Sequence, residues 1–128
     1  MAISIVQLGT PRNSGEGLRV GTVRRPPRGV AKSDFSKRNY YDVWFPNLSP
    51  TPELVKKALA AKDDRAWAAF RKDFLREMNA PERSRELDLL AALSHQTNFS
   101  VGCYCEEESR CHRSILRELL VDRGAAVV

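Results

Sequence analysis

The sequence has few of the residues that build disulfide-linked or membrane-spanning proteins. Only three of its 128 residues are cysteines, and all three fall between positions 103 and 111. An odd number of cysteines in one short window is not a disulfide framework, so a reducing, cytoplasmic setting is predicted. No run approaches the roughly 18 apolar residues that a membrane span needs. The first nine residues lack the basic and apolar regions of a secretory signal, so none is expected.

The residues that are present are typical of a soluble globular protein. Hydrophobic residues make up 42% and charged residues 29% of the chain, a balance that excludes disorder of the whole chain. A chain of this length can bury a hydrophobic core large enough to stabilise the fold without disulfides or bound metals. We therefore expect a single domain over residues 1–128.

The net charge of +5 belongs to the first part of the chain. Residues 1–50 hold eight Lys and Arg against three Asp and Glu. The densest basic stretch runs from Arg24 to Lys32, and Lys37 and Arg38 follow it. A basic loop can bind phosphates, nucleotides or nucleic acid. It can equally be a solvated surface loop, and charge alone leaves both interpretations open.

Short apolar runs alternate with longer amphipathic stretches along the chain. Strands are predicted over residues 4–8, 18–23 and 99–105, with a last short strand over 125–128. Helices are predicted over about 51–61, 64–78, 81–94 and 110–123. Residues 24–50 are predicted to be a long, mostly irregular functional loop. This order predicts the α/β class, with a single three-layer domain whose small, mainly parallel sheet is flanked by about four helices.

The residues best suited to catalysis, metal binding or anion binding lie within eleven positions: Cys103, Cys105, Cys111, His112 and Arg113. Strand alternation puts the first two cysteines on one face. Cys111 is predicted in the first turn of the following helix, where free N–H groups and the helix dipole favour an anion and lower a thiol pKa. A strand, a loop and a helix N-terminus with arginine beside it also suit a phosphate or carboxylate.

Four interpretations of this cluster stay open. In the first, Cys111 or Cys103 is a reactive thiolate, with His112 as the activating neighbour. In the second, Cys103, Cys105, Cys111 and His112 bind zinc; the number of donors fits, but two adjacent residues rarely reach one metal. In the third, Arg113, Arg110 and backbone groups bind an anion and the cysteines only shape the loop. In the fourth, the cysteines simply pack in the interior.

Three segments resemble the bacterial and archaeal proteins grouped as domain of unknown function 488 (DUF488). The strongest is residues 102–104, Gly-Cys-Tyr, leading to Cys-His-Arg at 111–113. The second is Arg28-Gly29-Val30 with Lys32, preceded by Arg24, which is similar to the family's Arg-Gly-x-x-Lys segment. The third is Trp44, Leu48 and Pro50 leading into the first predicted helix at Leu54. The resemblance covers roughly residues 18–120.

The chain departs from the family pattern at two positions. Cys105 stands where family members often carry glutamate, and Pro26 stands where a tryptophan often precedes Pro-Arg-Gly. The first departure removes a carboxylate from the site. The second removes an aromatic wall, which Tyr40, Tyr41 or Trp44 could replace.

The resemblance implies an α/β domain in which the basic segment and the Cys-His-Arg loop form one pocket. The family's function is unknown, so the resemblance assigns no activity and no cofactor. We predict a pocket for a small phosphorylated or nucleotide-like anion. Its predicted ligand-binding residues are Arg24, Arg28, Lys32 and Arg113, and its candidate catalytic residues are Cys111, His112 and Cys103.

The alternative to a small-molecule site is a nucleic-acid-binding module. That alternative predicts a flat basic face with exposed aromatics such as Tyr40 and Tyr41, and binding that weakens steeply with salt. The chain has no recognisable nucleic-acid reader motif, so the small anion is the first choice. No membrane partner is expected, and the oligomeric state stays open.

Overall fold

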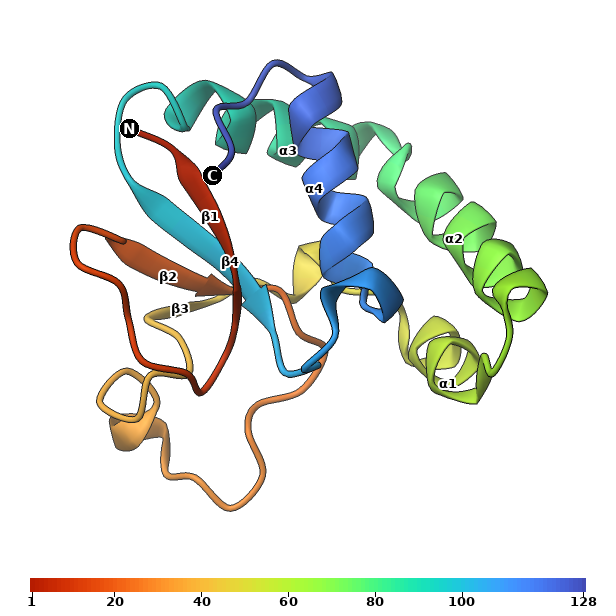
Figure 1. Cartoon of the computed structure of the whole chain (residues 1–128), viewed down its shortest axis with the longest axis horizontal. Helices are drawn as coiled ribbons and strands as arrows, with labels where there is room; N and C mark the ends of the chain where they lie inside the picture. Colours follow the sequence, from red (N-terminus) through yellow and green to blue (C-terminus); the bar gives the residue numbers. More distant parts are fainter.

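Four parallel strands form the sheet of the molecule (Figure 1). They are β1 (Ile3–Gln7), β2 (Leu18–Gly21), β3 (Val43–Trp44) and β4 (Phe99–Cys103), in the spatial order β1-β4-β2-β3. The computed structural model describes residues 1–128. Every residue of β4 is buried, because this strand lies between β1 and β2. Apart from Ser100 its residues are not polar, as suits a central parallel strand that is covered on both faces.

Four α-helices accompany the sheet: α1 (Pro52–Ala60), α2 (Asp64–Met78), α3 (Pro81–Leu93) and α4 (His112–Asp122). Proline occupies the first position of α1 and α3, where its missing N–H costs no hydrogen bond. The Asp63 side chain caps α2 by accepting a hydrogen bond from the Ala66 N–H. The predicted α/β class, with a parallel sheet and four helices, is confirmed.

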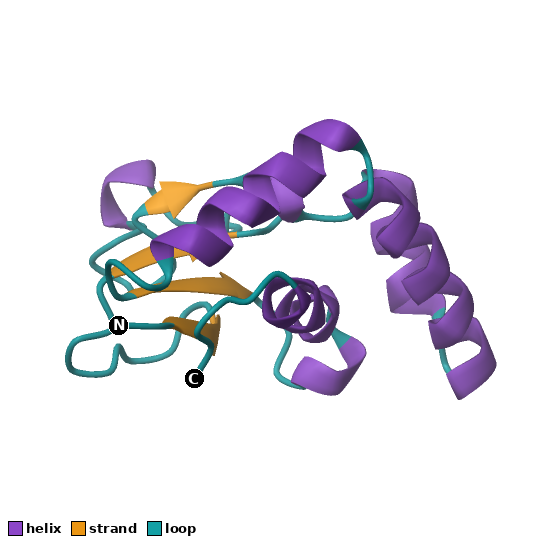
Figure 2. Ribbon diagram, turned by 90° about the horizontal axis from the view of Figure 1, so that it is seen from above, coloured by secondary structure: helices purple, strands orange, loops and turns teal.

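Helix α4 lies between the sheet and α2 (Figures 1 and 2) and packs against β4, α2 and α3. Phe70 and Phe74 of α2 stack at 5.9 Å between ring centroids. They meet Leu116 of α4 and Val101 of β4 in one buried cluster. Full burial of each such side chain contributes about 1.5–3 kcal/mol, so the apolar stripe predicted for α2 is core packing. None of the helices combines the length and apolar character needed to cross a membrane.

The boundaries around the cysteines differ from the predicted ones. Strand β4 ends at Cys103 rather than at 105, and α4 begins at His112 rather than near Arg110. The reason is a 3-10 turn, η3 (Glu108–Arg110), which is followed by the extended backbone of Cys111 at φ −123° and ψ 149°. Cys111 is therefore the N-cap of α4 and does not lie within its first turn.

The segment from 24 to 50 is mostly irregular, as predicted, but it contains three short elements. They are the 3-10 turns η1 (Lys32–Asp34) and η2 (Pro46–Leu48) and the edge strand β3, which the sequence prediction missed. The Trp44 indole N–H donates to the Val23 carbonyl at 2.7 Å and ties β3 to the end of β2. The strand predicted over 125–128 is reduced to an isolated bridge between Val127 and Ile3.

Candidate functional site

The cysteine loop is placed by a close approach of three strands at their carboxyl ends. Gly102 pairs with Val6 of β1 on one side and with Gly21 of β2 on the other. A Cβ atom at Gly102 would lie 2.8 Å from the Val6 carbonyl oxygen, a distance that real side chains do not adopt. Glycine therefore lets β1 and β4 lie close together and fixes Cys103 at this edge. Ligand sites of open parallel sheets lie at the same edge.

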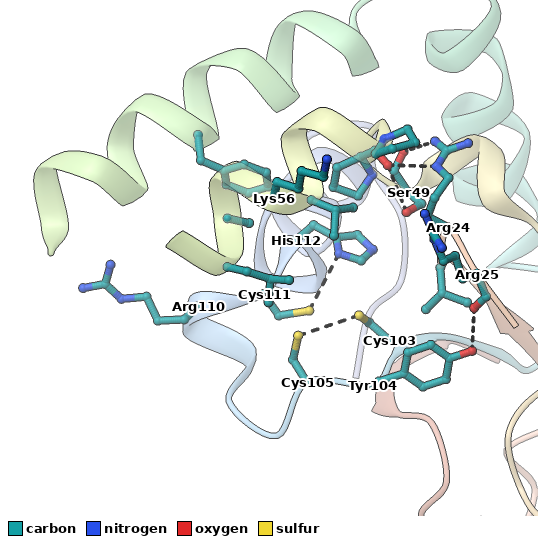
Figure 3. A pocket seen from close by; sticks show the side chains of 17 residues that line it. Arg24, Arg25, Ser49, Lys56, Cys103, Tyr104, Cys105, Arg110, Cys111 and His112 are labelled. Atoms are coloured by element: carbon teal, nitrogen blue, oxygen red, sulfur yellow. Dashed lines mark hydrogen bonds between the residues drawn. The ribbon is translucent and has the colours of Figure 1, made fainter. Parts of the chain in front are cut away.

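A pocket of about 370 Å³ opens beside this edge, between the cysteine loop, α1 and the segment after β2 (Figure 3). Side chains of α1 give it an apolar wall, and Phe70 of α2 contributes to the lining. The lining also contains all three cysteines, His112 and four cationic residues, but no carboxylate. The four cationic residues are Arg24, Arg25, Lys56 and Arg110.

The three cysteines are free thiols that gather on one side of the pocket. The Sγ atoms of Cys103 and Cys105 are 3.9 Å apart, and Figure 3 shows these two sulfurs facing each other. Cys103 and Cys111 are buried, whereas Cys105 is half-buried. The predicted placement of Cys103 and Cys105 on one side of the chain is thus confirmed.

Contact among the thiols concentrates negative charge on Cys105. The Cys103 thiol, and after it the Cys111 thiol, hold the pKa of Cys105 well below its ordinary value. Contact with Cys105 raises the pKa of Cys103. At Cys111 the Cys103 contact and the Arg113 backbone N–H lower the pKa, but Cys105 and burial outweigh them and the pKa is raised. The pKa of Cys111 is thus raised although the helix N-terminus favours a thiolate there, because Cys105 and burial oppose that effect.

His112 is buried and neutral. Its Nε2 lies 2.6 Å from the carbonyl oxygen of Thr22, which can only accept, so Nε2 carries the proton. Burial lowers the pKa of His112 to about 4. The unprotonated Nδ1 then lies 3.8 Å from the Sγ atom of Cys111. His112 is placed to accept a proton from Cys111, the role that the sequence predicts for it.

Arg113 lies behind the cysteine loop and is absent from the pocket lining. Its side chain is 3% exposed, and one guanidinium N–H donates to the Cys105 carbonyl oxygen at 2.6 Å. Its Nε atom has no hydrogen-bond partner, and the residue forms no ion pair with a carboxylate. This buried cation favours an anion nearby, and its charge contributes to the lowered pKa of both Glu108 and Cys105.

Replacing Arg113 by methionine is therefore expected to raise the pH midpoint of Cys105 alkylation by about one unit or more. Arg117→Met on the same helix is the matched control, because the Arg117 guanidinium binds the Glu108 carboxylate and the Val128 carbonyl and does not bind Cys105. The measurement is the rate of iodoacetamide addition at Cys105, followed by peptide mass spectrometry between pH 5 and 9. Identical pH profiles for the two variants would contradict a contribution of the Arg113 charge to the pKa of Cys105.

The other predicted ligand-binding residues lie in different places. Arg24 lines the pocket, but its guanidinium donates to the carbonyl oxygens of Ser49 and Pro50 at 2.9 and 3.0 Å. It thus ties the basic segment to the start of α1. Arg28 lines a neighbouring hollow that shares Arg25 and Tyr104 with the pocket, and Lys32 is exposed and lines neither.

Two cationic residues of the pocket were missed as site residues by the sequence analysis. Arg25 lies in the basic run, so its charge was a signal for a site residue, but it does not belong to the Arg-Gly-x-x-Lys motif. Lys56 carries no signal of this kind, because it is one of several charged residues on a surface helix.

The aromatic residues near the pocket differ from two expectations drawn from the sequence. One was an aromatic wall from Tyr40, Tyr41 or Trp44, and the other was a basic face with exposed Tyr40 and Tyr41. Tyr104 lines the pocket, and its hydroxyl donates to the Arg25 carbonyl oxygen at 2.8 Å. Tyr40 packs edge-on against Tyr104, with ring centroids 6.2 Å apart. Tyr41 is 4% exposed, so the expectation of an exposed Tyr41 on a nucleic-acid-binding face is wrong. Tyr41 is buried because its ring packs over Gly21 and against Phe35.

The buried side chains Cys103, Cys111 and His112 could hold a metal ion. Their ligand atoms all lie within 4.8 Å of one another. A sulfur and a nitrogen bound to the same zinc are about 3.5 Å apart, and the adjacent pair Cys111 and His112 comes close to this at 3.8 Å. The sequence-based objection to adjacent donors is therefore weaker in the folded chain. Cys105, the fourth residue of the predicted zinc set, is not among these three, although its Sγ atom lies 3.9 Å from that of Cys103.

Comparison with known proteins gives one finding. The family model described as "Active DUF488-N3 subclade" matches residues 3–124. The match includes the sheet, the four helices and the whole cysteine loop. No curated protein and no solved structure matches the chain.

Proposed function

This chain belongs to the DUF488 family, and we propose that it is an enzyme that attacks a small anionic molecule with a thiolate of the cysteine cluster. The observation that carries the proposal is the lining of the pocket, where four cationic side chains and three thiols meet without a single carboxylate. The cations attract an anionic substrate, and a thiolate is a nucleophile. The description of the matching subclade as active agrees with an enzyme.

The anionic group of the substrate is expected to lie between Arg25 and Lys56. Both side chains are exposed, and neither forms an ion pair. The other two cations are already engaged, since Arg110 pairs with Asp64 and Arg24 binds backbone carbonyls. A phosphorylated or nucleotide-like small molecule suits this arrangement, because the apolar wall from α1 can accommodate the rest of the molecule.

The reacting part of the substrate is expected to lie against the sulfurs. In the proposed step a sulfur electron pair forms a bond to the electrophilic centre, and the leaving group departs with the electrons of the broken bond. Contact with the Cys103 thiol lowers the pKa of Cys105, which is also the most exposed thiol of the cluster. Cys111 remains the nucleophile predicted from the sequence, and this role requires transfer of its proton to Nδ1 of His112.

The binding half of the proposal is tested with inorganic phosphate as the probe. Arg25→Gln and Lys56→Gln are each expected to weaken phosphate binding about fivefold, which corresponds to about 1 kcal/mol. Lys62→Gln is the matched control, because Lys62 is also exposed and forms no ion pair but lies outside the pocket. The measurement is a phosphate titration followed by calorimetry at low salt. Equal affinities for Lys56→Gln and Lys62→Gln would contradict an anion site in this pocket.

A further inference from the structure

We propose that Cys105 and Cys103 form a peroxide-reactive pair, in which Cys105 is oxidised by a hydroperoxide and Cys103 then closes a disulfide with it. This inference goes beyond the proposed function, because it requires no anionic ligand in the pocket. It rests on the position of the two sulfurs, on their different exposure and on the buried cation behind them.

The two sulfurs have the positions that such a pair requires. Cys105 is half-buried and lines the pocket, so a small oxidant can reach its sulfur through the opening. Cys103 is 7% exposed and lies 3.9 Å away, sulfur to sulfur. Closing this gap to a bond of about 2.05 Å needs a movement of about 2 Å.

The backbone of the cysteine loop permits this movement on one side of the pair. Cys103 is held in β4, where it pairs with Gln7 of β1. Cys105 lies beyond the end of β4, outside the strand pairing. The hydrogen bond from Arg113 to the Cys105 carbonyl is the contact that positions it. We therefore expect Cys105 to move toward Cys103, which stays in place.

The charges around the pair favour an anionic sulfur at Cys105. Arg113 is buried behind the loop with no carboxylate partner, and Arg25, Lys56 and Arg110 line the same pocket. A thiolate, and not a thiol, attacks a peroxide, and sensor cysteines are those with thiolate character and solvent access.

The reaction has two steps, and the peroxide supplies the oxidising equivalents. In the first, the Cys105 thiolate attacks one peroxide oxygen, the S–O bond forms, the O–O bond breaks, and hydroxide leaves and takes up a proton to become water. In the second, the Cys103 sulfur gives up its proton and attacks the sulfur of the Cys105 sulfenic acid. The S–S bond forms, the S–O bond breaks, and a second water leaves. The two thiols lose two electrons and hydrogen peroxide gains them.

The disulfide would remove the resting thiolate from the pocket. A small dithiol such as dithiothreitol would restore it by thiol–disulfide exchange. After oxidation the pocket would thus lack the Cys105 and Cys103 thiols, while Cys111 would stay a free thiol and Arg25 and Lys56 would still bind phosphate. Failure of one proposal therefore leaves the other open to its own test.

The experiment uses the full reduced chain, freed of metal with a chelator and treated with hydrogen peroxide. The remaining thiols are then alkylated with N-ethylmaleimide, and the protein is cleaved with trypsin. Cleavage after Arg110 separates Cys103 and Cys105, in the peptide 86–110, from Cys111, in the peptide 111–113. We expect peptide 86–110 to lose two hydrogens and take up no label, while peptide 111–113 is labelled.

Two variants identify the role of each sulfur. Cys103→Ser is expected to stop at the sulfenic acid of Cys105, which dimedone captures. Cys105→Ser is expected to lower the rate of peroxide consumption at least tenfold. Thermal unfolding of each variant shows whether it is folded. If a variant fails to fold, the peptide map of the unaltered chain decides the question.

Three results would overturn the proposal. One is a disulfide that joins peptide 111–113 to peptide 86–110, since Cys111 would then be the resolving thiol. Another is oxidation of Cys105 no faster in the folded chain than in guanidinium chloride, since the fold would then give it no special reactivity. The third is a peptide 86–110 that stays fully labelled after peroxide.

Discussion

Lowering the pH from 6.5 to about 4 is expected to remove about 3 kcal/mol from the free energy of unfolding through His112 alone. Burial lowers the pKa of this side chain from 6.5 to about 4 in the folded chain. Between these values the unfolded chain binds a proton that the folded chain does not bind. The stability therefore rises with pH through this window and falls as the pH is lowered. Each pKa unit corresponds to 1.36 kcal/mol, which gives the total.

His112→Gln is the control that isolates this effect. The glutamine amide N–H₂ can keep a hydrogen bond to the Thr22 carbonyl oxygen, but it does not titrate in this range. The measurement is urea unfolding at several pH values between 4 and 7. Carboxylates such as Glu16 and Asp42 have lowered pKa values in both proteins, so their contribution cancels in the difference. A slope between pH 4 and 6.5 that survives in His112→Gln would contradict the assignment.

The same neutral state decides what His112 can do in the pocket. Above about pH 4 its Nδ1 atom is a proton acceptor beside Cys111, and no imidazolium charge is present to stabilise a thiolate there. The cations that can do so are arginines and Lys56. The pKa of Cys105 is lowered first by contact with the Cys103 and Cys111 thiols, and Arg113 adds a smaller contribution.

Features that depend on local pattern could be predicted from the sequence. The spacing of Phe70, Phe74 and Met78 fixes one face of α2, and all three are buried in the core. The apolar run that contains Val101 gives β4. The elements alternate as a parallel sheet requires, so the basic segment and the cysteine loop follow neighbouring strands. The basic segment and the cysteine loop are also segments on which the resemblance to the DUF488 family rests.

Features that depend on distant contacts could not be predicted in this way. Strand β3 has only two residues, and it forms through pairing with β2. Arg24 and Arg113 carry the charge of ligand-binding residues, but each donates to backbone carbonyls that only the fold brings near. The pKa values of the cysteines depend on contact among all three thiols. A spacing of two and six residues in the sequence does not show such contact.

The other large expected effect concerns Arg19, whose replacement by methionine should lower the free energy of unfolding by about 3–5 kcal/mol. Arg19 is fully buried and makes two hydrogen bonds to the Glu16 carboxylate, at 2.8 and 3.0 Å. The two N–H groups of its Nη1 atom donate to the carbonyl oxygens of Thr10 and Asn39. The methionine variant leaves Glu16 as a buried charge without its partner, and this loss is the main source of the destabilisation.

The consequence extends to the functional site, because Glu16 also accepts a hydrogen bond from the Ser100 hydroxyl at 2.7 Å. Ser100 lies in β4, three residues before Cys103, so the buried ion pair links the loop after β1 and the start of β2 to the strand that carries the cysteines. Weakening this network should therefore make Cys103 more accessible to alkylation in the native protein, before global unfolding is reached.

Three variants distinguish a buried charge from a general loss of packing. Arg76→Met removes an exposed arginine that pairs with Asp73, and it should change the free energy of unfolding by less than about 1 kcal/mol. Adding Glu16→Gln to Arg19→Met should recover part of the lost stability, because no buried charge then remains unpaired. Urea unfolding at pH 7 measures all three. If the double variant is no more stable than Arg19→Met, the lost packing of the long arginine side chain, and not the unpaired carboxylate, sets the cost.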